Sequence, residues 1–101
     1  MTRRSAQYGD PRSYLLDPSE WPEGDLTADA PPAAVHLQQI VRAVEAALAE
    51  ASISRRELAR RSGLGNATLD RLLNGVGWPD YLTIVAIEDA VGVAIWPDRT
   101  I

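Results

Sequence analysis

Apolar residues recur at spacings of three and four along the middle of the chain, the period of one face of an α-helix. The clearest stripe predicts a helix from about Ala33 to Ala51. Its apolar positions are Leu37, Ile40, Val41, Val44, Leu48 and Ala51. Arg42, Glu45 and Glu50 fall on the other side, so we expect this helix to cover a small core with one face.

A second helix is predicted to begin after Ser54, because Ser54-Arg55-Arg56-Glu57 has the pattern of a capping box. In such a box the serine side chain accepts from the N3 amide and the glutamate reaches back to the cap. Ile53 and Leu58 stand where a hydrophobic staple would fix the entry angle. Gly63 predicts the end of this helix, since the position past the last turn often needs a positive φ.

A third helix is expected from about Asn66 to Leu73, with its three leucines buried and Asn74-Gly75 as its stop. Two short helices joined by a glycine-containing turn describe a helix-turn-helix. That shape suits DNA, because an α-helix fits the major groove and a partner helix across its back holds it there.

A fourth helix is expected after Pro79, with Asp80 as its cap and Gly92 at its end. Residues 93–97 are short and apolar. They form either a final turn packed on the first helix or an edge strand, and the sequence does not decide between these.

Residues 1–33 contain five prolines with acids interleaved and show neither a helical nor an alternating period. This composition predicts an extended or disordered arm, followed by a helix-turn-helix domain over residues 34–97 and a tail over 98–101. The arm nevertheless carries an apolar cluster, which either docks on the domain or binds a partner protein. Its members are Tyr14, Leu15, Leu16 and Trp21.

Composition excludes several kinds of chemistry. The chain has no cysteine and one histidine, His36, which rules out disulfides and thiolate metal sites and makes a zinc cluster improbable. We find no catalytic constellation and no phosphate-binding glycine loop, so we expect neither an enzyme nor a cofactor. No signal peptide and no apolar run of about 20 residues is present, and we therefore expect a cytoplasmic protein.

The net charge of −4 is unusual for a DNA-binding protein, because phosphate contacts favour a basic surface. The charge is unevenly distributed along the chain. Residues 54–75 carry five arginines against Glu57 and Asp70, a local charge of +3. The acidic excess lies largely in residues 1–34, which hold six acids against three arginines.

The segments Ser54–Leu64 and Thr68–Gly75 resemble the lambda-repressor-like, or XRE/Cro-type, DNA-binding domain found in bacteria and phage. That family has the pattern ELA, then glycine and a small apolar residue, then a Thr/Ser-Ile-x-Arg block. A second family block appears here as Pro79 followed by Leu82–Val93. The resemblance covers residues 35–96 and implies an all-α fold of four or five short helices.

The resemblance also implies roles for individual residues. By position, Gly65, Asn66, Ala67 and Arg71 would face base edges. Arg55, Arg60, Asn74 and the Gly75 amide would lie against phosphates. For Asn66 an alternative stays open, since it either pairs with adenine or caps the third helix.

Two departures from the family stand out. Family members often place an arginine in the first helix that pairs with the glutamate of the second, but an ungapped match puts Leu48 there. Glu57 would then serve only its capping box. A fifth helix, which frequently builds the dimer interface in this family, is cut short by Pro97.

The sequence therefore predicts sequence-specific binding of double-stranded DNA by a transcriptional regulator, as a homodimer on a two-fold site. The alternative is a protein-interaction module, such as an antitoxin or an accessory subunit, that keeps the helix-turn-helix scaffold. An acidic, proline-bearing arm would then bind the partner protein, and the negative net charge and the truncated fifth helix favour this alternative.

Overall fold

A computed structural model describes residues 8–97 of the chain. Over that range the fold consists of four α-helices and two short 3-10 helices, with a single isolated β-bridge between Leu15 and Leu26. The elements are η2 (Pro11–Tyr14), η3 (Pro18–Glu20), α1 (Pro32–Ala51), α2 (Arg55–Ser62), α3 (Asn66–Leu73) and α4 (Tyr81–Val91). The all-α prediction is confirmed, with four helices at the expected positions.

Local signals set the helix ends as the sequence predicts. The Ser54 hydroxyl accepts from the Glu57 amide at 3.0 Å, and the Asp80 carboxylate accepts from the Thr83 amide at 2.8 Å. Each bond satisfies one of the amides that a helix start leaves unpaired. Gly63 and Gly92 end α2 and α4 in the left-handed region, both with a φ of 77°.

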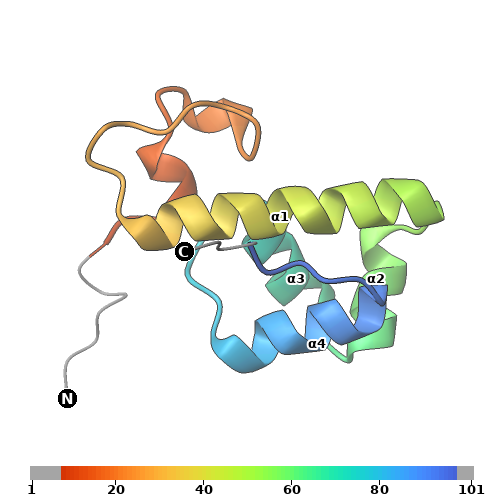
Figure 1. Ribbon diagram of the computed structural model, residues 1–101. Helices are drawn as coiled ribbons and strands as arrows, with labels where there is room; N and C mark the ends of the chain where they lie inside the picture. Colours follow the sequence, from red (N-terminus) through yellow and green to blue (C-terminus); the bar gives the residue numbers. More distant parts are fainter. Residues whose placement is uncertain (1–7, 98–101) are drawn as a thin grey trace, which may run out of the picture.

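The long helix α1 lies between two parts of the molecule (Figure 1). The N-terminal segment packs along one side of it, and α2, α3 and α4 lie on the other. The hydrophobic core draws on all four helices and on the C-terminal segment. Its buried members are Leu37, Ile40, Val41, Val44, Leu48, Leu58, Ala59, Leu69, Leu72, Leu73, Ile84, Ile87 and Ile95.

Residues 8–31 differ from the extended or disordered arm that their composition predicts. Leu15 is buried, Tyr14 and Trp21 are half-buried, and only Leu16 of the expected apolar cluster is fully exposed. The Trp21 indole N–H donates to the Leu73 carbonyl at 3.1 Å. Tertiary contacts of this kind order a segment whose own sequence has no helical or strand period.

Residues 93–97 do not form the edge strand that the sequence left open as one alternative, and they contain no helical turn. Ile95 is buried in the core, and its amide donates to the Glu88 carboxylate at 2.9 Å. No fifth helix is present up to Pro97, the last described residue. Within the same range, no helix combines the length and the apolar character needed to cross a membrane.

Candidate nucleic-acid interface

Helices α2 and α3 form the predicted helix-turn-helix. Ala59 is buried where the two helices meet, which is consistent with a small residue allowing close approach. Leu58 and Leu69 are fully buried, and Leu64 packs against the core from the turn. These contacts leave the outer side of α3 exposed to solvent.

No side chain caps the N-terminus of α3. Gly65 is the N-cap residue, and its carbonyl accepts from the Leu69 amide at 3.1 Å. Asn66 is the first helical residue and makes no capping bond, so the capping alternative for Asn66 is wrong. Gly65, Asn66 and Ala67 are all exposed, as a surface that approaches base edges requires.

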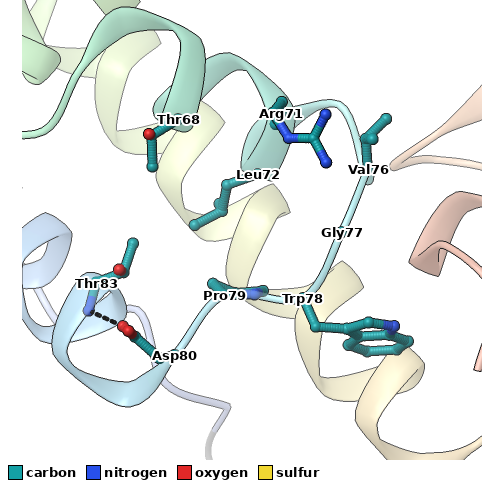
Figure 2. Close-up of a pocket in the computed structure, with 9 residues that line it drawn as sticks. All are labelled: Thr68, Arg71, Leu72, Val76, Gly77, Trp78, Pro79, Asp80 and Thr83. Atoms are coloured by element: carbon teal, nitrogen blue, oxygen red, sulfur yellow. Dashed lines mark hydrogen bonds between the residues drawn. The ribbon is translucent and has the colours of Figure 1, made fainter. Parts of the chain in front are cut away.

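Arg71 lies one turn further along α3 and is exposed. Figure 2 shows it beside a hollow between α3 and α4, with Thr68 on the same side of α3 and Thr83 across from it on α4. The family pattern did not single out Thr68 as a contact residue. Its spacing of three from Arg71 places both on one helix face, which is a signal that the sequence contains.

Arg55 connects three helices. Its guanidinium lies 3.3 Å from the Glu45 carboxylate of α1 and 3.5 Å from Asp70 of α3, and it donates to the Asn74 side-chain oxygen at 3.0 Å. The pair with Glu45 reverses the family arrangement, since here the acid belongs to α1 and the arginine to α2. Asp70 is thereby turned toward Arg55, and no ion pair joins it to Arg71 among the described residues.

Glu57 does not close its half of the predicted capping box. Its carboxylate instead accepts from Arg60 at 2.5 Å and from Arg61 at 2.8 Å. These hydrogen bonds, followed by the charges of the two arginines, lower the pKa of Glu57 to about 2. The prediction that Glu57 serves only the capping box is wrong, because its carboxylate bonds to the guanidinium groups of Arg60 and Arg61, three and four residues further along α2.

Gly75 is less accessible than the family pattern implies. It is buried, and its amide donates to the Leu72 carbonyl at 3.1 Å. Its carbonyl accepts from the Arg12 amide at 3.0 Å, and the Trp21 ring covers its Cα. With its amide already engaged, Gly75 has no free donor to offer a phosphate, and we leave it out of the proposed interface.

The basic charge of the helix-turn-helix is largely paired within the protein. Arg55, Arg60 and Arg61 each contact a carboxylate, so the local +3 overstates the charge that is free for phosphates. Of the arginines in residues 54–75, Arg56 and Arg71 have no ion-pair partner within residues 8–97. Arg60 keeps 72% of its side chain exposed despite its pair.

No group of histidine, cysteine, aspartate or glutamate side chains in residues 8–97 is arranged to hold a metal ion.

A family model described as a helix-turn-helix matches residues 44–95, from the second half of α1 to Ile95. Comparison with curated proteins and with solved structures found no match.

Proposed function

Because the chain belongs to the lambda-repressor-like helix-turn-helix family, we propose that it is a transcriptional regulator that binds double-stranded DNA sequence-specifically. One observation carries this proposal. Arg71 projects from the exposed side of α3 with no carboxylate paired to it in the described chain, since Asp70 faces Arg55. An unpaired guanidinium on a recognition helix is free to donate to guanine N7 and O6.

The remaining base contacts come from the same side of α3. Asn66 is exposed and its side chain makes no capping bond, so its side-chain amide is free to bond to adenine N6 and N7. Gly65 and Ala67 are small and exposed, which allows the helix start to approach the bases closely. Thr68 is an additional contact of this surface, since its hydroxyl lies on the same helix face as Arg71.

Phosphates are contacted from the two ends of the helix-turn-helix. Arg55 and Asn74, joined by a hydrogen bond, present a fixed pair of donors near the end of α3. Arg60 contacts a phosphate only by exchanging its bond to Glu57 for one to the DNA. Arg56, which is exposed and lines the same hollow as Arg60, adds a fourth position.

The active form in this proposal is a homodimer. One helix-turn-helix covers few base pairs, and two copies on a two-fold site double the contacts. Within residues 8–97, five of the seven large apolar side chains that are exposed lie on α4 and in the segment after it, which favours self-association there. They are Tyr81, Leu82, Val85, Val93 and Trp96.

The proposal extends to a non-enzymatic protein of bacterial or phage type that acts in the cytoplasm. Its test is selection from a random pool of double-stranded DNA with the full chain. We expect one motif to be enriched, with two-fold symmetry and a half-site spacing set by the dimer. If no motif rises above the starting pool at low salt, sequence-specific binding is excluded.

The second candidate is a protein-interaction module, such as an antitoxin or accessory subunit. The apolar exposure of α4 favours it as well, and so does local charge, because residues 72–97 contain three acids and no lysine or arginine. Exposed Leu16 would extend such a contact to the N-terminal segment. A steep fall of DNA affinity with salt supports the regulator, whereas a flat slope with weak affinity supports this second candidate.

A further inference from the structure

The C-terminal end of α3 is held by a residue from the start of the chain. We propose that Trp21 is a positioning residue for the recognition helix, acting on Arg71 through the end of α3 and the loop that follows it. The consequence for DNA binding rests on the proposed function. The structural part, that Trp21 fixes the end of α3, does not.

The first step is the end of the helix itself. The last four carbonyls of an α-helix have no partner within it. After α3, Gly75 is left-handed with a φ of +74°, and its amide and that of Val76 turn back onto the carbonyls of Leu72 and Arg71. No backbone amide reaches the Leu73 carbonyl within the described residues. This carbonyl accepts from the Trp21 indole, which supplies the missing partner from a distant part of the chain.

The same segment bonds along the loop from α3 to α4. The Gly75 carbonyl accepts from the Arg12 amide, and the Gly77 amide donates to the Asp10 carboxylate, both at 3.0 Å. The Trp78 indole donates to the Gly9 carbonyl, also at 3.0 Å. The N-terminal segment thus holds the loop at the backbone of Gly75 and Gly77 and at the side chain of Trp78.

This loop adjoins the side chain that we assign to base reading. A Cβ atom placed on Gly77 would lie 3.3 Å from the Arg71 guanidinium, so the Gly77 backbone forms one wall beside that group. In Figure 2 the Arg71 guanidinium lies next to the Val76–Gly77 part of the loop. Movement of the loop therefore changes the space that is open to Arg71.

The residues that follow Trp21 are bonded to α1. Gln38 donates to the Gly24 carbonyl at 2.7 Å, and Arg42 donates to the Pro22 carbonyl at 2.8 Å. Gln38 is a buried polar side chain, and this bond satisfies its amide. Through its neighbours Pro22 and Gly24, Trp21 consequently connects the long helix to the end of the recognition helix.

The test compares Trp21→Phe with Thr27→Val in the full chain. Trp21→Phe keeps an aromatic ring but removes the donor to Leu73, whereas Thr27→Val removes a side-chain hydrogen bond to Asp29 within the same N-terminal segment. Amide hydrogen exchange is followed at Asn74, Gly75 and Val76, which donate to carbonyls of α3. We expect exchange there to speed up about three- to tenfold in Trp21→Phe, with no change in α1 and none in the control.

Binding to the selected DNA motif provides the second readout. We expect Trp21→Phe to weaken binding about two- to tenfold and to relax the preference at the base that Arg71 reads, with the control unchanged. Unchanged exchange at the three amides overturns the proposal, and so does an equal increase in every helix. Faster exchange without any effect on DNA overturns the link to Arg71. If no motif is selected, the proposed function fails, and exchange alone still decides whether Trp21 fixes α3.

Discussion

The indole of Trp21 lies against the backbone of Gly75, two residues from distant parts of the chain. A Cβ atom added to Gly75 would fall 2.7 Å from two carbons of the ring. Gly75 also has a φ of +74°, a conformation that side chains disfavour. Glycine at this position is therefore required twice, by its backbone and by its neighbour, and the contact makes the N-terminal segment an integral part of the domain.

Gly75→Ala should lower the free energy of unfolding by about 2–4 kcal/mol, because a left-handed alanine and an overpacked contact add their costs. Gly63→Ala is the matched control. Gly63 has nearly the same φ, +77°, and nothing within 4 Å of its Cβ position, so only the conformational cost of about 1–2 kcal/mol applies. Urea unfolding measures both, and equal losses would show that the Trp21 contact is not tight.

The helices could be predicted because their signals are local. Ser54, Gly63, Asp80 and Gly92 all act within a few residues of the ends they set. The third helix likewise begins and ends where Asn66 and the Asn74-Gly75 stop indicate. Periodicity and capping rest on short sequence spacings, and those spacings survive in the folded protein.

The N-terminal segment could not be predicted in this way. Its order depends on partners far along the chain, such as Leu73 for Trp21 and Gly77 for Asp10. The ion-pair partner of Arg55 could not be predicted for a similar reason. Arg55 has the position of a phosphate contact in the family pattern, but its acid Glu45 belongs to α1, and only the packing of α1 on α2 brings the two together.

Glu57 should titrate well below an ordinary glutamate. Its pKa is about 2 in the folded protein against 4.5 for an unperturbed glutamate, because Arg60 and Arg61 hydrogen-bond its charged form. A lowered folded pKa contributes stability that is complete above pH 4.5 and is lost as the pH falls toward 2. Carboxyl chemical shifts in a pH titration measure this directly, and Glu57→Gln should remove that part of the acid dependence. A midpoint near 4.5 would contradict the pairing.

Glu57→Gln should also strengthen non-specific DNA binding. The substitution releases Arg60 and Arg61 from their carboxylate partner, and the slope of affinity against salt should steepen by about two phosphate contacts at most. Glu50→Gln on α1 is the control, since it removes the same charge from an exposed acid outside the helix-turn-helix. Equal effects of the two variants would attribute the gain to net charge alone.

Self-association and DNA binding should respond to salt with opposite signs. Asp80, Glu88 and Asp89 accompany the exposed apolar side chains of α4, so added salt screens repulsion between two copies. Leu82 is 75% exposed, and Leu82→Ser should weaken the dimer while leaving the free energy of unfolding of the monomer within about 0.5 kcal/mol. Sedimentation at low and high salt measures the dimer, and a monomer under all conditions would contradict a self-contact here.

The most direct test of the central claim is parallel selection of DNA motifs by the wild-type chain, Arg71→Ala and Arg56→Ala. Both arginines are exposed and without an ion-pair partner in residues 8–97, but only Arg71 lies on α3. We expect Arg71→Ala to lose about 1–3 kcal/mol on the wild-type motif and to lose preference at one base position in each half-site. Arg56→Ala should weaken all sequences alike. If Arg71→Ala selects the wild-type motif with unchanged affinity, α3 does not read DNA through Arg71.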